Sequence, residues 1–293
     1  MKESDYLWRG MALNGQFRVL AVSSTNTVQA ARDIHDLSPI NTILMGKMIS
    51  AVAMLSLDLK DEGAEVTLRF DGDGPLKGAL AICNNQGDVR GYAFEPKFWL
   101  EDLQENFHPV KYLGDGTLTI IKYYPGDRPT KGLTPLIEGD VAQNLAYYFE
   151  QSEQIPTAVN LGVLIDKDAK VRAAGGFIIQ QLPSADLLNA DRLIDNINHM
   201  PNLSDLMDMG MYLPEILHRF VFKEGGLELY PAHRVRYHCH CSKERFKAAL
   251  KLLSLDELKE LRDGIDPVCQ FCNATWHFSA AEIEEIISEL EKK

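Results

Sequence analysis

Four of the five cysteines stand in two close pairs near the C-terminus, Cys239-x-Cys241 and Cys269-x-x-Cys272. Each pair can hold one metal ion through both sulfurs, and two pairs together supply the four ligands of a closed tetrahedral zinc site. The intervening segment, 242–268, is long enough to fold back and bring the pairs together. The same thiols can instead be oxidised to disulfides. The pattern therefore predicts a small module whose fold depends on the state of four thiols.

The expected cellular compartment favours the metal. The N-terminal sequence MKESDYLWRG carries charge where a signal peptide has an apolar core, so we expect a cytoplasmic protein that is not exported. Cysteines in that compartment stay mostly reduced, and paired motifs there are typical of metal-binding or redox-active sites. We therefore expect one Zn²⁺ in the reduced form, with these ligands: Cys239, Cys241, Cys269 and Cys272.

Other polar motifs have simpler interpretations. His238, His240 and His277 flank the thiols, but four cysteines already complete a tetrahedron, so we expect these histidines to be solvated or to adjust the site from outside it. Cys83 lies in a predicted strand and is expected to be a small buried apolar residue. The run Asp71-Gly72-Asp73-Gly74 lacks the features of a P-loop or an EF-hand and predicts a hairpin turn. Because no nucleophile–base–acid combination stands out, we do not expect an enzyme.

Charge and hydropathy exclude two classes of partner. The net charge of −12 argues against nucleic-acid binding, which depends on neutralising phosphates with Lys and Arg. Ile40–Leu59 is strongly apolar, but Lys47 and several polar residues interrupt it, whereas a spanning helix needs about 20 residues almost free of charge. We expect a buried helix there and no membrane association.

The first 181 residues predict an α+β domain. Strand-like runs rich in branched and aromatic residues occur at 16–22, 65–70, 76–82, 89–94, 117–123, 161–165 and 171–180. Helical patterns occur at 27–36, 42–59 and 140–152. The strands between Glu65 and Phe94 leave no room for crossover helices, so antiparallel hairpins are expected. At 293 residues the chain is also long enough for a second, smaller module.

Residues 182–226 predict a helical, Met-rich linker broken by prolines. Four of the nine methionines fall within twelve positions: Met200, Met207, Met209 and Met211. Flexible thioethers either fill gaps between packed helices or form an adaptable binding surface, and both interpretations stay open here. Gly225-Gly226 marks the expected boundary with the zinc module, 227–293.

The predicted module has little apolar core. Two capping boxes, Ser254–Glu257 and Ser279–Glu282, begin short helices with few apolar residues each. A module of this size normally needs a metal or cross-links to hold its fold. Structural zinc contributes about 10–16 kcal/mol in small peptides. Oxidation of one cysteine pair would leave two sulfur ligands, too few for a closed site, so a thiol reaction would become a large structural change.

The whole chain resembles the redox-regulated 33 kDa chaperonin family. In the module the resemblance consists of Cys-x-Cys followed by Ser-Lys-Glu-Arg, then Cys-Gln-Phe-Cys with Trp276 and Phe278 after it. Two residues depart from the family pattern: Trp276 stands where a tyrosine is usual, and Pro267, close before the second pair, is expected to alter the entry turn. The N-terminal landmarks are Asp5-Tyr6-Leu7 with Arg9, Thr25-Asn26-Thr27-Val28, Asp71–Leu76, Ser152–Pro156 and Ala173–Phe177.

That resemblance implies an ATP-independent holdase of the stress response, inactive when reduced and zinc-bound. Oxidants, aided by unfolding conditions, would form the disulfides Cys239–Cys241 and Cys269–Cys272, release zinc and loosen the module and the linker. The apolar surface thus exposed would bind unfolding proteins, and family members form homodimers. Because an extended Cys-x-Cys backbone holds its Cα atoms near the limit of disulfide reach, we expect Cys269–Cys272 to be the stabler bond.

Two other classes of function stay open. A thiol-disulfide oxidoreductase would use Cys269 and Cys272 and would need a free pair with a lowered thiol pKa, which the four-cysteine arrangement disfavours. A zinc-stabilised adaptor without redox switching would keep its metal under mild oxidation and would show no change in surface hydrophobicity.

Overall fold

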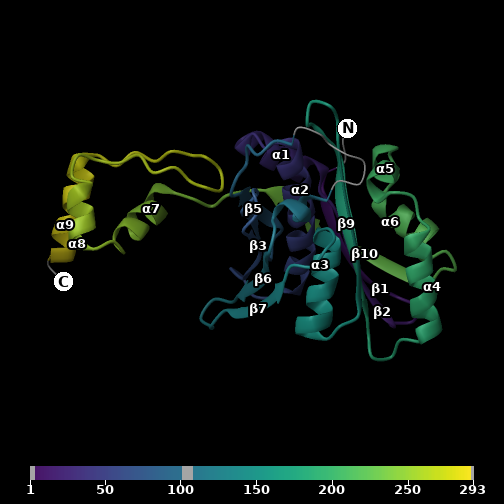
Figure 1. Ribbon diagram of the computed structural model, residues 1–293. Helices are drawn as coiled ribbons and strands as arrows, with labels where there is room; N and C mark the ends of the chain where they lie inside the picture. The colour runs from purple at the N-terminus through teal and green to yellow at the C-terminus, as the bar shows by residue number, and fades with distance from the viewer. Residues whose placement is uncertain (1–3, 101–107, 292–293) are drawn as a thin grey trace. The chain divides into compact units, whose positions relative to one another are not determined.

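The computed structural model describes residues 4–100 and 108–291, and these form two compact units with the division after His238. The first unit contains two sheets (Figure 1). One has the strand order β10-β1-β2-β9-β8, and the other has the order β11-β5-β4-β3-β6-β7. Among the described strands, β11 and β5 pair in parallel, and the other neighbours are antiparallel.

The strands of the first sheet are β1 (Tyr6–Ala12), β2 (Phe17–Ser23), β8 (Thr157–Ile165), β9 (Val171–Gln181) and β10 (Leu227–Arg234). Those of the second are β3 (Glu65–Gly72), β4 (Gly78–Asn84), β5 (Asp88–Ala93), β6 (Gly116–Tyr123), β7 (Thr130–Pro135) and β11 (Arg236–Tyr237). The strand runs expected from the sequence each coincide with one of these strands. β1, β7, β10 and β11 were not predicted, because their residues alternate less clearly between apolar and polar.

The α+β class and the antiparallel hairpins are confirmed. β3, β4 and β5 are consecutive antiparallel neighbours, and Asp71–Gly74 leads from β3 into the turn before β4, as predicted. Gly72 is needed in this turn, because a Cβ atom there would lie 2.0 Å from the backbone oxygen of Leu113. Cys83, on β4, is completely buried, and burial raises the pKa of its thiol to about 12. Its predicted role as a small core residue is confirmed.

The helix predicted over the apolar stretch is α2 (Pro39–Leu55), and a short 3₁₀ turn, η1 (Ser56–Asp58), continues it. The Ser38 side chain caps its first turn, and every residue of α2 except Pro39, Ile43 and Lys47 is buried. Residues 39–58 are long and apolar enough to span a membrane, yet 89% of the tested window is buried inside the protein. An all-round apolar helix is typical of a core, and α2 is the centre of this one.

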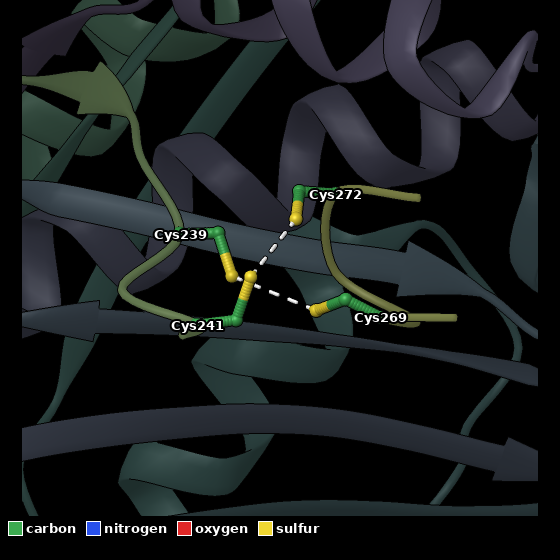
Figure 2. Close-up of side chains that lie close together, drawn as sticks. All are labelled: Cys239, Cys241, Cys269 and Cys272. Carbon is green, nitrogen blue, oxygen red and sulfur yellow. Dashed lines mark hydrogen bonds between the residues drawn. The ribbon is translucent and has the colours of Figure 1, made fainter. Parts of the chain in front are cut away.

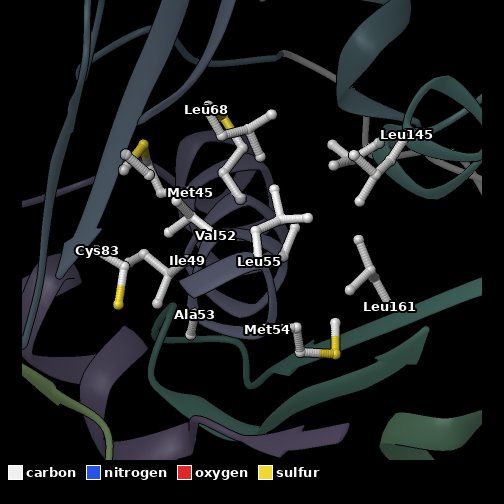
Figure 3. Close-up of a cluster of buried hydrophobic side chains, with 14 of the residues drawn as sticks. Met45, Ile49, Val52, Ala53, Met54, Leu55, Leu68, Cys83, Leu145 and Leu161 are labelled. Carbon is white, nitrogen blue, oxygen red and sulfur yellow. The ribbon is translucent and has the colours of Figure 1, made fainter. Parts of the chain in front are cut away.

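Side chains from α2 and from both sheets form one continuous core (Figure 3). Met45, Ile49 and Val52 lie near Leu68 of the second sheet, and Leu161 of the first sheet closes the other side. The other helical elements of this part of the first unit are α1 (Thr25–His35), η2 (Pro109–Tyr112), α3 (Val141–Tyr148) and the π-helical turn η3 (Phe149–Glu153).

Residues 182–226 are helical, as predicted, and cover the other face of the first sheet (Figure 1). They form α4 (Leu187–Asn198), α5 (Leu203–Asp208), α6 (Leu213–Ile216) and η4 (Leu217–Val221). Their apolar side chains pack on Trp8, Phe17 and Phe177 in a second core cluster. Met200, Met207 and Met211 pack against this cluster, whereas Met209 is 79% exposed. The gap-filling interpretation therefore holds for these three methionines, while a binding surface at Met209 stays a prediction.

The first compact unit extends beyond Gly226. Residues 227–234 form β10, which pairs with β1 along most of its length, and residues 236–237 form β11 on the second sheet. The division between compact units therefore falls after His238, later than the boundary expected from the Gly225-Gly226 pair. The division into a 1–181 domain, a 182–226 linker and a 227–293 functional module stays a prediction.

The second unit contains three short helices, α7 (Lys243–Leu250), α8 (Leu255–Glu260) and α9 (Ala280–Glu291). Both predicted capping boxes are present: Ser254 with Glu257, and Ser279 with Glu282. The buried apolar core contains Leu250, Leu258, Phe278, Ile283, Ile286 and Ile287. Six side chains are a small core for a unit of this length, as the sequence predicted.

Candidate metal centre

The four paired cysteines come from two kinds of local structure. Cys239 and Cys241 lie in the irregular segment between β11 and α7. Cys269 and Cys272 lie in a tight turn, in which the N–H of Asn273 donates to the backbone oxygen of Cys269 (2.8 Å). The N–H of Cys269 donates to the oxygen of Ala274 (2.9 Å), which closes the base of the turn. Paired segments on either side, with bridges Ile265–Phe278 and Val268–Thr275, hold this turn in place.

The four Sγ atoms converge on one point, all within 4.8 Å of one another (Figure 2). Two contacts join one pair to the other: Cys239 Sγ to Cys269 Sγ is 3.7 Å, and Cys241 Sγ to Cys272 Sγ is 3.4 Å. A disulfide needs about 2.05 Å, so these sulfurs are separate thiols. A tetrahedron with metal–sulfur bonds of about 2.3 Å has edges of about 3.8 Å. The sulfurs therefore fit a tetrahedral metal ion.

Backbone N–H groups point at the sulfurs and favour their anionic form. The pKa of Cys269 is lowered: burial acts to raise it, but hydrogen bonds from the backbone N–H of Phe271, from the thiols of Cys272 and Cys239 and from the backbone N–H of Cys272 together outweigh that effect. Burial raises the pKa of Cys239, against a backbone hydrogen bond from Cys241, and it raises the pKa of Cys272 to about 11. The N–H of Ala274 donates to Cys272, so three of the sulfurs accept hydrogen bonds from backbone N–H groups, as metal-bound thiolates do.

The chemistry of the donor set selects the type of ion. Four thiolates are soft ligands, and a tetrahedral sulfur site is typical of zinc or of an iron–sulfur centre. With all four positions taken by protein sulfur, such a site leaves no open position for a substrate, as in structural zinc sites. The cluster can hold a metal ion, and its ligands need no histidine. His277 instead pairs with Asp266, with 2.7 Å between Nδ1 and Oδ1, and is exposed.

Charged residues support the same unit from outside. Lys243 and Lys247 on α7 pair with Glu282 (2.6 Å) and Glu285 (3.4 Å) on α9, and the Nζ of Lys243 lies 5.1 Å from the centre of the Phe278 ring. The hydrogen bond from Lys243 lowers the pKa of Glu282 to about 2. Exposed pairs of this kind contribute little stability each, so their main effect is to orient α7 against α9.

These observations define an α+β protein that carries a small unit with four clustered cysteines able to hold a metal ion. The family model for the Hsp33 protein matches residues 5–279, and the chain belongs to this family. A 33 kDa chaperonin of Agathobacter rectalis is 37% identical and covers 97% of this chain and 99% of its own length. One from Clostridium perfringens is 36% identical, covering 99% of this chain and 93% of its own length.

A solved structure shows the same fold over the same length. The crystal structure of the 33 kDa chaperonin (heat shock protein 33 homolog) from Thermotoga maritima matches with a TM-score of 0.90 and 29% identity. The match covers 99% of this chain and all of that one. The family resemblance inferred from the cysteine pattern and the N-terminal landmarks is therefore confirmed.

The sequence identified the four cysteines but not the backbone N–H groups that donate hydrogen bonds to their sulfurs. The donors to Cys269 come from its own turn, whose Asn273 has a left-handed φ of 58°. An Asn directly after Cys-x-x-Cys is a local signal for this conformation, because Asn tolerates positive φ better than most residues. The base of the turn is closed by bridges between residues before Cys269 and residues after Cys272. The spacing of the cysteines does not predict these bridges.

Proposed function

We propose that the protein is a redox-regulated, ATP-independent holdase in which Cys239, Cys241, Cys269 and Cys272 bind one Zn²⁺ in the reduced, inactive state. Membership of the Hsp33 family supports a chaperone, as the names of its relatives indicate. One observation carries the switch: four sulfurs within 4.8 Å of one another in a unit with only a small apolar core. Loss of a ligand pair then removes the main stabiliser of the unit.

The oxidation step is a two-electron reaction. Two cysteine sulfurs lose one electron each and form a disulfide, while peroxide takes up the two electrons and two protons and becomes two molecules of water. We propose the pairs Cys239–Cys241 and Cys269–Cys272 for the oxidised form. Each disulfide removes two ligands at once, and two remaining sulfurs cannot close a tetrahedral site. The greater stability expected for Cys269–Cys272 stays a prediction.

The client-binding surface we propose is the apolar face beneath the 182–226 helices. There, Leu193, Leu206 and Ile216 pack on the first sheet around Phe17 and Phe177. Several apolar side chains of these helices are already exposed in the resting form: Leu187, Leu188, Ile194 and Met209. Loosening of the helices would add the buried members of the cluster to this surface, and a large apolar patch is what an unfolded chain can bind.

The partners and location proposed with this function follow the family. We propose a cytoplasmic homodimer whose partners are unfolded or partly folded proteins, without nucleic acid, membrane or enzymatic activity. The net charge of −12 and the burial of α2 support the absence of the first two.

The decisive experiment follows zinc and chaperone activity in one titration. Reduced, zinc-loaded full-length protein is treated with peroxide at mildly elevated temperature, while a chromophoric chelator reports free zinc and light scattering reports aggregation of a denatured test protein. We expect about one zinc per chain to leave in step with a gain in aggregation suppression. Cys83→Ala is the matched control and should behave as the parent, because that thiol is completely buried and far from ionisation.

The outcomes separate the alternatives. Zinc that stays bound under mild oxidation, with no gain in suppression, would contradict the proposal and support a zinc-stabilised adaptor. Turnover of a disulfide substrate that depends on Cys269 and Cys272 would support an oxidoreductase instead.

A further inference from the structure

The four residues immediately before Cys239 are held on the first unit by backbone and side-chain hydrogen bonds and an ion pair. We call Val235, Arg236, Tyr237 and His238 the clasp. Its middle two residues form β11, which pairs in parallel with Asp88 and Val89 of β5. The N–H of Arg236 donates to the oxygen of Gly87 (3.1 Å), and the N–H of His238 donates to the oxygen of Val89 (2.8 Å). The clasp therefore ends one residue before the first metal ligand.

The Tyr237 side chain extends this pairing along β5. Its hydroxyl donates to the backbone oxygen of Gly91 (2.6 Å) and accepts from the N–H of Gly91 (3.2 Å). The phenol thus bonds to both the N–H and the carbonyl oxygen of Gly91. These are the groups that the backbone of a longer β11 strand would have paired with. Because the hydroxyl proton is used on Gly91, the Nε2 of His35, 2.9 Å away, must donate to the phenol oxygen. Tyr237 thereby also ties the clasp to the end of α1.

The other clasp residues anchor to separate elements. Val235 is buried, and its N–H donates to the backbone oxygen of Asp5 (3.2 Å). The Nε of Arg236 lies 2.6 Å from Oδ1 of Asp88, whose side chain is 3% exposed. The clasp therefore joins the start of β1, the end of α1 and the edge of β5 within the first unit.

The clasp lies, along the chain, between the metal unit and the part of the protein proposed to loosen. Before it comes β10, and before β10 come the 182–226 helices. Disorder that starts at Cys239 after metal loss must pass through the clasp to reach β10. We propose that the clasp is a second lock, which keeps β10 and these helices in place after the metal has left; this inference rests on the proposed function. Two residues of parallel pairing are weak alone, so the lock depends on the Tyr237 hydroxyl.

The test compares two tyrosines in the same stretch of chain. Tyr237→Phe removes the hydroxyl from the clasp. Tyr230→Phe removes a hydroxyl from β10 instead, where Tyr230 is 61% exposed and its hydroxyl donates to the Glu228 carboxylate over 3.5 Å. Backbone hydrogen exchange by mass spectrometry is measured on the reduced full-length protein, zinc-loaded and after chelation. Peptides covering 227–238 and 239–291 are compared.

The expected result is specific to the clasp. After chelation, the parent and Tyr230→Phe lose protection in 239–291 but keep it in 227–238, while Tyr237→Phe exchanges about tenfold or more faster at 235–238. Zinc affinity is the same in all three. Two results would overturn the inference. One is that the parent loses protection from exchange in 227–238 together with 239–291 after chelation. The other is that Tyr237→Phe exchanges at the same rate as the parent. Should Tyr237→Phe fail to fold, Arg236→Gln weakens the clasp at a second point, its ion pair with Asp88, and should also speed exchange at 235–238 after chelation, though less than about tenfold; unchanged exchange there would count against the lock.

A functional arm separates this inference from the proposed function. Under peroxide, Tyr237→Phe should suppress aggregation at a lower temperature than the parent and Tyr230→Phe. Absence of suppression in every variant would refute the holdase, while the exchange data would still decide whether the clasp outlasts the metal. Equal activation temperatures for all three, with suppression present, would refute the lock alone.

Discussion

Asp5 shows how a single buried carboxylate can join distant segments. Its Oδ2 accepts from the N–H (2.6 Å) and the hydroxyl (2.7 Å) of Thr27, and its Oδ1 accepts from the N–H of Asn26 (3.2 Å). Asp5 thus caps the first turn of α1, while the hydroxyl of Ser24 bonds to Ser50 instead (2.8 Å). Negative charge at a helix N-terminus is favourable, but this carboxylate is also largely removed from water.

The ionisation of Asp5 should make the unfolding free energy depend on pH. Burial is the largest effect and raises its pKa above the usual 3.8, although the hydrogen bonds from Thr27 and Asn26 oppose it. The folded protein therefore holds this proton more tightly than the unfolded chain, so the contribution is complete below pH of about 3.8 and is lost as the pH rises through the folded pKa. Asp5→Asn removes this dependence.

We therefore expect the unfolding free energy of the parent, minus that of Asp5→Asn, to fall as the pH rises from about 3.8. Urea unfolding at a series of pH values measures it, with Asp33→Asn, an exposed carboxylate on α1, as control. A difference that grows with pH would show that the hydrogen bonds outweigh burial.

At the scale of elements, α2 owes its position to an ion pair as well as to its apolar surface. Lys47, which interrupts the apolar stretch, pairs with Asp140, and their side chains are 12% and 9% exposed. Asp140 is also the N-cap of α3, where its Oδ1 accepts from the N–H of Val141 (2.7 Å) and Gln143 completes a capping box. The charge that argued against a membrane span therefore joins two core helices.

Asp140→Ala should destabilise the protein by about 3–5 kcal/mol, because it leaves the Lys47 ammonium buried without its partner and removes the cap of α3. Lys47→Met should cost less, since Asp140 keeps its backbone donors and Met fits an apolar site. The double variant should recover part of the loss of Asp140→Ala. Urea unfolding of the three variants measures these differences, and an equal cost for both single changes would contradict this account.

At the scale of the whole molecule, the two compact units should differ in their dependence on metal. The first has a large core built on α2 and both sheets, whereas the second has six buried apolar side chains. A unit of this size with so small a core normally needs a metal or cross-links to offset the entropy of ordering its chain, so we expect the proposed metal to supply the difference.

Chelation of the reduced protein should therefore unfold 239–291 and leave the first unit folded. Trp276 packs against the core of the second unit, with its indole Nε1 buried, so its fluorescence should shift to the red on chelation. Trp276→Phe should abolish most of that shift, and far-UV circular dichroism should keep the signal of the first unit. Cooperative loss of both units would contradict this expectation.

The sequence by itself determined the features that depend on neighbouring residues. Period-two and period-3.6 patterns located most strands and the main helices, Ser–Glu spacing located the capping boxes, and cysteine spacing predicted the sulfur cluster. Each of these signals lies within a few residues, where chain geometry alone brings side chains together.

Only the tertiary structure decided what joins distant segments. β10 was assigned by sequence to the zinc module, yet it pairs with β1, more than two hundred positions earlier in the chain. Lys47 meets Asp140, and Tyr237 meets Gly91, because the packing of α2 and the edge of β5 place them together. No short-range pattern encodes such contacts. Bringing distant residues together costs the entropy of closing a long loop, and packing of the whole core offsets this cost, not the two residues that meet.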